Sequence, residues 1–180
     1  MKKVLITILA LVSLAGCSLS NTPSSVVQTY LDNYKNLSDE VITQLEAKVS
    51  NEDLSNVNRE TYKSILSKQY KDLKYEIKDE SIDGDKAEVL AKITVYDLFK
   101  ADNEANAYMN ETPVEFYNDS GVFDNDLFNT YRLNKMNEIS DTVDYEIIFK
   151  LNKKDGEWIL EEPDRDTLEK IHGLYNYKID

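Results

Sequence analysis

Tyrosine is the most prominent of the residue types that could do chemistry, with twelve copies in 180 residues. Each tyrosine combines a large apolar ring with a hydroxyl that needs a hydrogen-bond partner when buried. Several fall on predicted core faces, beside two small alanines on the longest predicted strand. Small side chains there would leave room for a ligand, whereas close helix packing over them is the alternative. The candidate cavity-lining residues are Tyr30, Tyr34, Tyr62, Tyr75, Ala87, Ala91 and Tyr145.

Acid–base and nucleophilic chemistry find little support. His172 is the only histidine, so a multi-histidine metal site is excluded, and no Gly-x-Ser-x-Gly turn supplies a serine nucleophile. We expect His172 to be a partly exposed polar residue near a helix C-terminus. The inward positions of the predicted strands carry no carboxylate, which disfavours general acid–base catalysis. Asp97 and Glu115 lie outside those strands, so a catalytic role for either carboxylate stays open. No catalytic residue is assigned.

Acidic residues raise the question of calcium. Residues 79–90 begin like a calcium-binding loop, but a leucine stands at the twelfth position, where a bidentate glutamate is needed. Asp124, Asp126 and the segment 161–166 also carry carboxylates, which helix N-caps and solvated surface explain equally. Because Cys17 is the only cysteine, an internal disulfide and a cysteine-based cluster are excluded. The sequence predicts neither a metal nor another cofactor.

The N-terminus has the layout of an export signal. Two lysines precede an apolar stretch, residues 4–14, which is shorter than the ~20 residues of a membrane span. The sequence Leu-Ala-Gly-Cys at positions 14–17 resembles the bacterial lipobox. This resemblance implies a signal peptide over residues 1–16 and acylation of Cys17. A secretory signal with an incidental cysteine is the alternative.

A lipid on Cys17 implies a protein held at the extracytoplasmic face of the cell membrane. One acyl chain gives only marginal membrane binding, but lipoproteins of this type carry several, which implies a permanent anchor. Residues 17–24 are polar and would form the tether. The abundance of lysine, asparagine, isoleucine and acidic residues favours a Gram-positive cell surface.

The mature chain is strongly acidic. Removal of residues 1–16 leaves 19 basic and 34 acidic residues, a net charge of −15. This balance argues against nucleic-acid binding, which depends on neutralising phosphates. It also argues against a domain lying flat on an anionic membrane, while solubility alone explains the acidity.

Hydrophobic periodicity predicts helices at both ends of one domain, residues 25–180. A spacing of three and four residues predicts a helix after Ser24 or Ser25 as N-cap, a second after Ser38 and a third from Asn58. A less regular helical insertion covers about residues 99–140. Pro163 opens the last helix.

Strict alternation predicts two β-hairpins. Residues 73–95 alternate around the turn Asp83-Gly84-Asp85, and residues 143–160 alternate around a turn at 152–156. Runs of helices beside antiparallel hairpins predict an α+β fold, with helices covering one face of the sheet.

This order of elements resembles the NTF2-like superfamily, and in particular the uncharacterised NTF2-like domains of bacterial lipoproteins. The resemblance rests on three segments, 26–31, 85–89 and 154–159, and covers roughly residues 24–162. It implies a cone-shaped, curved antiparallel sheet packed against the N-terminal helices and enclosing a pocket. The insertion and the helix after Pro163 exceed the family pattern, and either could cap the cone.

The sequence thus predicts a non-enzymatic binding domain whose partner is a small hydrophobic ligand or an envelope protein. The insertion would be its recognition element, so removing residues 101–120 should leave a folded domain. The alternatives are an enzyme acting on a small hydrophobic molecule in the cone and an accessory subunit of an envelope complex.

Overall fold

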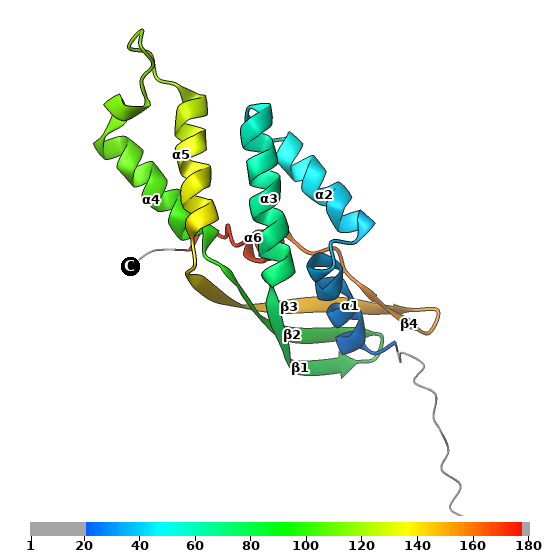
Figure 1. Cartoon of the computed structure of the whole chain (residues 1–180). Helices are drawn as coiled ribbons and strands as arrows, with labels where there is room; N and C mark the ends of the chain where they lie inside the picture. The colour runs from blue at the N-terminus through cyan, green and yellow to red at the C-terminus, as the bar shows by residue number, and fades with distance from the viewer. Residues whose placement is uncertain (1–20, 178–180) are drawn as a thin grey trace, which may run out of the picture.

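The computed structural model of the chain describes residues 21–177. The proposed signal peptide and Cys17 lie outside the described residues. Within them the chain forms six α-helices, one short 3₁₀ helix and four strands, which confirms the α+β class (Figure 1).

Three capped helices open the domain. Their bounds are α1 Pro23–Lys35, α2 Asp39–Ser50 and α3 Asn56–Asp72. Ser38 caps α2 as predicted, because its hydroxyl accepts a hydrogen bond from the Val41 amide. The first helix begins earlier than predicted, since Thr22 is its N-cap and forms a capping box with Ser25.

The four strands form one antiparallel sheet in the order β1-β2-β3-β4. Their bounds are β1 Lys74–Asp83, β2 Lys86–Tyr96, β3 Thr142–Lys154 and β4 Glu157–Leu160. Both predicted hairpins are present, and β2 pairs with β3 along its whole length, with Val89 opposite Phe149. The side-chain period of two places every second residue of β2 in the core.

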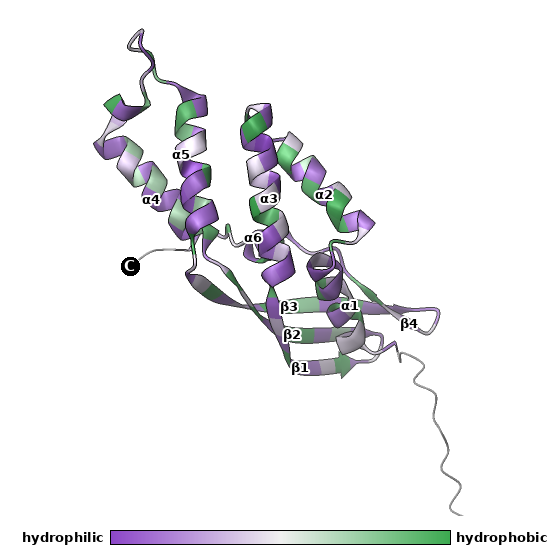
Figure 2. Cartoon of the chain, viewed as in Figure 1, coloured by the Kyte–Doolittle hydropathy of each residue, from purple (hydrophilic) through white to green (hydrophobic). Residues whose placement is uncertain are grey.

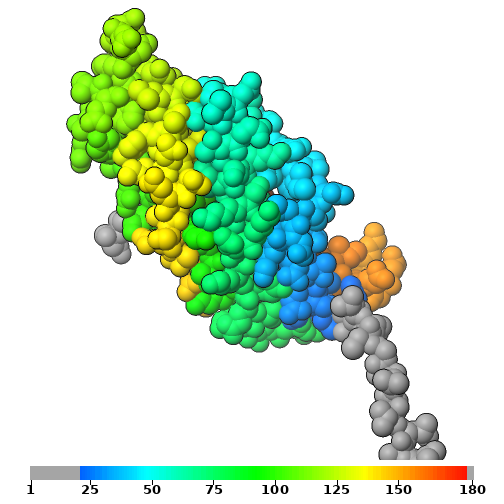
Figure 3. Space-filling model, viewed as in Figure 1, coloured from blue at the N-terminus to red at the C-terminus, as the bar shows by residue number. Residues whose placement is uncertain are grey.

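The predicted insertion consists of α4 Leu98–Glu111, the 3₁₀ helix η1 Pro113–Phe116 and α5 Asn125–Glu138. Its base belongs to the main core, where Ala101, Leu133 and Met136 are buried. Removing residues 101–120 would therefore cut into the core, so the insertion is not a separable appendage. Its outer end projects beyond the rest of the domain (Figure 3).

The last helix, α6 Arg165–His172, is fixed against the sheet by Gln69 of α3. The Gln69 side chain accepts a hydrogen bond from the Tyr96 amide at 3.0 Å and donates to the Ile171 carbonyl at 3.4 Å. Gly173 ends the helix at φ 71°, a left-handed conformation that glycine adopts without strain.

All the helices lie on one side of the sheet (Figure 1). The core therefore fills the space between helices and sheet, whereas Ile148 and Ile159 on the other face are at least half exposed. Figure 2 shows the same division, with apolar and polar residues alternating along the strands. The inner face of the sheet is filled by buried side chains rather than lining an open cone.

Candidate functional site

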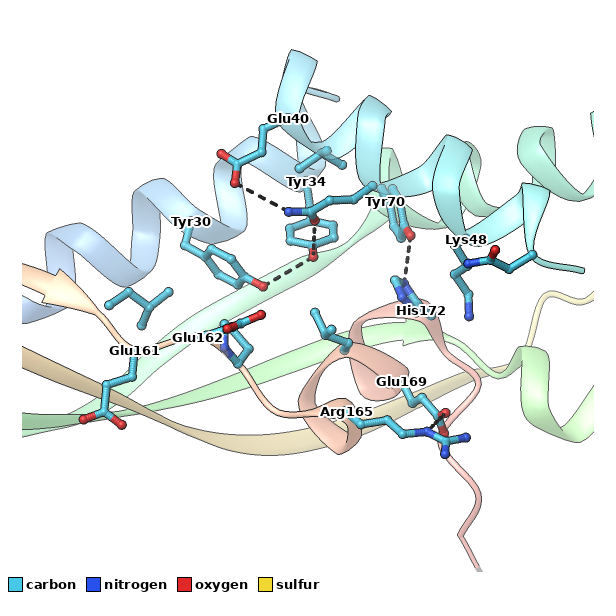
Figure 4. A pocket seen from close by; sticks show the side chains of 16 residues that line it. Tyr30, Tyr34, Glu40, Lys48, Tyr70, Glu161, Glu162, Arg165, Glu169 and His172 are labelled. Carbon is cyan, nitrogen blue, oxygen red and sulfur yellow. Dashed lines mark hydrogen bonds and ion pairs between the residues drawn. The ribbon is translucent and has the colours of Figure 1, made fainter.

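A hollow lies beside the filled core, not within it. A cavity of about 830 Å³ opens between α1, α2, the link from β4 to α6, and α6 itself. Tyr70 of α3 closes its inner wall. This volume falls within the ~300–1,000 Å³ typical of small-molecule sites. Figure 4 shows the side chains of these separate elements converging on one space.

The lining residues of each helix are three or four positions apart, so they lie on the one helix face that borders the cavity. Tyr30 and Tyr34 are four residues apart on α1, so they share one face of that helix. The same spacing relates Glu40, Gln44 and Lys48 on α2. On α6 the cavity face carries Arg165, Glu169 and His172, at spacings of four and three residues.

Hydrogen bonds between two tyrosine hydroxyls and an amide connect α1 to α2 in the cavity wall. The Tyr30 and Tyr34 hydroxyl oxygens lie 3.3 Å apart, and the Tyr34 hydroxyl donates to Gln44 Oε1 at 3.4 Å. The rings of the two tyrosines meet edge to face, with centroids 5.4 Å apart. Burial raises the pKa of both phenols above the ordinary value, so both keep their protons at neutral pH.

At the inner end of the cavity, Tyr70 and His172 share a hydrogen bond. The Tyr70 hydroxyl oxygen lies 2.8 Å from His172 Nδ1. Burial, and secondarily the charge of Lys48, lowers the pKa of His172 to about 3, while burial raises that of Tyr70. A protonated phenol donating to a neutral imidazole satisfies both groups. This pair therefore presents a neutral polar wall at physiological pH.

Four carboxylates and two cations surround these neutral groups. Arg165 and Glu169 of α6 pair with each other at 2.8 Å, with the Arg165 side chain largely exposed. The side chain of Gln44 donates to Glu40 at 3.5 Å, and that of Asn152 donates to Glu161 at 2.6 Å. Lys48 and Glu162 complete the charged lining. The cavity thus combines apolar and aromatic surface with fixed hydrogen-bonding groups and charges of both signs.

Two of the seven predicted lining residues, Tyr30 and Tyr34, do line this cavity. Ala87 and Ala91 are buried in the core of the sheet, away from it. Tyr62 borders a separate hollow of about 190 Å³ near Arg132.

The remaining two predicted residues serve other parts of the fold. Tyr75 donates to Asp32 at 2.8 Å, and burial together with that carboxylate raises its pKa to about 12. Tyr145 packs edge to face on Tyr175, and its buried hydroxyl has no hydrogen-bond partner among residues 21–177.

The carboxylates left open by the sequence have structural roles. Asp97 caps α4 by accepting from the Lys100 amide at 3.0 Å, and it also accepts a hydrogen bond from Tyr177. Glu115 accepts from the Tyr108 hydroxyl at 2.7 Å. Asp124 and Asp164 cap α5 and α6. Within residues 21–177 no group of three or more potential ligands is placed to hold a metal.

Sequence reasoning missed Tyr70 and His172 as a pair, as well as the stripes on α2 and α6. The Tyr70–His172 contact joins positions 102 residues apart, so no local pattern reveals it. The helical stripes did leave a signal, because polar residues recur at the four-residue spacing of one helix face. A search of these helices for polar as well as apolar periodicity would have identified the cavity-lining faces of α2 and α6.

Comparisons with protein-family models, curated proteins and solved structures returned no match to this chain. None of the helices in residues 21–177 is long and apolar enough to cross a membrane.

Proposed function

We propose that this chain is a lipid-anchored extracytoplasmic binding protein, whose NTF2-like domain holds a small molecule in the cavity between α1, α2 and α6. The observation that carries the proposal is the cavity's lining. Tyr30, Tyr34 and Tyr70 present rings and protonated hydroxyls to the cavity, and apolar residues such as Leu168 complete the lining. Such a mixture of apolar surface and a few fixed polar groups is typical of ligand sites.

The protonation states favour binding over acid–base catalysis. A general acid or base works best with a pKa near the operating pH. His172, with its pKa near 3, stays neutral, and the raised pKa values of the lining tyrosines keep them protonated. These groups can donate and accept hydrogen bonds without exchanging a proton with a ligand. A non-enzymatic role is therefore the proposal, in place of an enzyme acting in the cone.

The test is a ligand screen on the mature chain carrying Cys17→Ser, read by backbone amide chemical shifts. Ligands from a mixed library of small amphipathic molecules should shift the amides of Tyr30, Gln44 and Leu168. Gln44→Trp, at an exposed wall position, should block them by filling the space. Hits that map elsewhere, or that survive a folded Gln44→Trp variant, would refute a binding role for the cavity.

A second candidate function is docking of an envelope protein on the tip of the insertion. Four apolar side chains there are at least 44% exposed, namely Val114, Tyr117, Val122 and Leu127. Residues 101–131 include seven acidic and no basic residues. Apolar anchors inside an acidic field fit a protein surface that places lysine or arginine around apolar side chains.

Membrane crosslinking separates this second function from the first. A photoreactive residue at Val122 should capture a basic protein, in a salt-sensitive manner that Val114→Ser abolishes. The matched control is the equally exposed Ile148 on the outer sheet face, which should capture nothing. Equal capture from both positions would contradict a docking site at the tip.

A further inference from the structure

The two ends of the cavity carry opposite charges. In Figure 4, Glu40 and Glu162 lie at the end occupied by Tyr30, whereas Lys48 lies at the other end, beside His172. Glu40 and Lys48 are eight residues apart on α2, so a rise of 1.5 Å per residue separates them by about 12 Å along the helix. The cavity is therefore an elongated site with an acidic and a basic end.

One charge at each end is unpaired. Arg165 and Glu169 neutralise each other. Neither Glu162 nor Lys48, by contrast, has an ion pair or a side-chain hydrogen bond with any residue in the range 21–177. A free carboxylate and a free ammonium that line the same cavity are complementary to a ligand carrying both charges.

The middle of the cavity suits a polar backbone. Gln44 lies between Glu40 and Lys48 on α2, and its amide and the Tyr34 hydroxyl supply a donor and acceptors. Leu160, Pro163 and Leu168 add apolar surface to the lining. The Tyr30 ring lies near the acidic end, where an aromatic face favours an organic cation. A fatty zwitterion would leave the remaining hydrogen-bonding capacity of the Gln44 amide unused, whereas peptide groups would pair with it.

We propose, as an extension of the proposed ligand-binding function, that the cavity binds a short peptide with free termini. The peptide ammonium would lie against Glu162 and Glu40, and its carboxylate against Lys48. An extended chain spans at most 3.3–3.6 Å per residue, so about 12 Å corresponds to three or four residues. A single amino acid is too short to reach both ends.

The experiment uses randomised tetrapeptide mixtures in three forms: free at both ends, N-acetylated, and C-amidated. Each is incubated with the mature Cys17→Ser chain, and retained peptide is quantified by mass spectrometry after gel filtration. Free peptides should be retained, and blocking either end should reduce retention about tenfold or more, because each end loses a charge-assisted contact.

Charge variants assign the two ends. Lys48→Gln should reduce the retention of free peptides to the level that the wild type shows for C-amidated peptides. Glu162→Gln should reduce it to the level that the wild type shows for N-acetylated peptides. Lys86→Gln and Glu88→Gln make the same charge changes at exposed positions on β2 and should leave retention unchanged. Equal retention of all three peptide forms, or equal effects of the β2 variants, would overturn the assignment.

A neutral apolar probe, N-phenyl-1-naphthylamine, separates failure of the inference from failure of the function. If the probe binds and Gln44→Trp blocks it, while no peptide form is retained, the cavity binds ligands but the peptide class is wrong. If neither probe nor peptide binds, the proposed function itself fails, and the peptide inference with it.

Discussion

At the residue scale, His172 shows how burial sets the chemistry of a group that its type alone leaves open. An ordinary histidine titrates near pH 6.5 and could act as a proton shuttle. Here the ring packs against Tyr70 and faces Lys48 of α2, with Arg165 and Glu169 on its own helix. Burial, with a smaller contribution from Lys48, disfavours a second proton on it. The residue type thus suggests a proton shuttle, whereas the surroundings hold the ring in its neutral form.

The lowered pKa of His172 makes stability depend on pH. Because its pKa is about 3 in the folded state and about 6.5 unfolded, its contribution is complete above pH 6.5 and is lost as pH falls toward 3. Between pH 7 and pH 5, the free energy of unfolding should fall on the order of 1–2 kcal/mol further for the wild type than for His172→Asn. Urea denaturation at both pH values measures this difference. Identical pH dependence in the two proteins would show that the imidazole is not held neutral.

Gly173 is the glycine whose lack of a side chain the fold requires. A Cβ atom there would lie 2.3 Å from the Tyr96 carbonyl oxygen and 2.6 Å from Gln69 Nε2. Gly173→Ala should therefore destabilise the protein by roughly 2–4 kcal/mol in urea denaturation, from left-handed strain plus overlap with β2.

Gly121 provides the matched control, since its φ of 72° is nearly the same and a Cβ there would meet nothing within 4 Å. Gly121→Ala should reduce the free energy of unfolding by only about 1 kcal/mol, because it adds the strain of a left-handed alanine without an overlap. Equal losses for the two variants would mean that the contact with β2 is unimportant.

At the element scale, the strands were predictable because their alternation is a local property. Val89 and Ala91 face the core for the same reason that Glu88 faces water, namely the side-chain period of two. The path of α6 was not predictable, because it depends on Gln69, a polar residue whose two hydrogen bonds join α3 to both β2 and α6. Only the assembled fold reveals the cavity, since its walls come from segments more than 100 residues apart.

The difference between the inner and outer faces of β2 distinguishes an open cone from a filled one. Ala91 is fully buried among the helices and strands of the core. Ala91→Leu should therefore overpack this region and reduce the free energy of unfolding by about 1–3 kcal/mol. Thermal and urea unfolding measure the loss.

Glu88→Leu adds a similar apolar side chain on the exposed face of the same strand and should change stability by no more than about 0.5 kcal/mol. If Ala91→Leu were as harmless as this control, the space beside Ala91 would be open and the interpretation of a hollow cone would regain support.

At the scale of the whole molecule, the described domain comes close in sequence to the proposed anchor. Asn21 donates to the Trp158 carbonyl at 3.3 Å and accepts a hydrogen bond from the Trp158 amide, so it is fixed to β4. Four residue steps separate it from Cys17 and span at most about 14 Å. The tether is thus shorter than residues 17–24, and an acylated Cys17 would hold the β4 side of the domain near the lipid. The tip of the insertion, between α4 and α5, lies at the opposite end of the domain from the start of α1 (Figures 1 and 3).

Cys17→Ser tests this arrangement. The lost thiol would prevent acylation, so the protein should move from the membrane fraction to the soluble fraction. The variant should keep the wild-type melting temperature, because the substitution lies outside the domain that residues 21–177 form. Equal melting temperatures exclude misfolding as the cause of release. A Cys17→Ser protein that stayed with the membrane would contradict a lipid on Cys17 as the sole anchor. A net charge of −15 makes direct contact of the mature chain with an anionic surface unfavourable, so retention would point either to uncleaved apolar residues 4–14 or to a protein partner, and the mass of the retained chain separates the two.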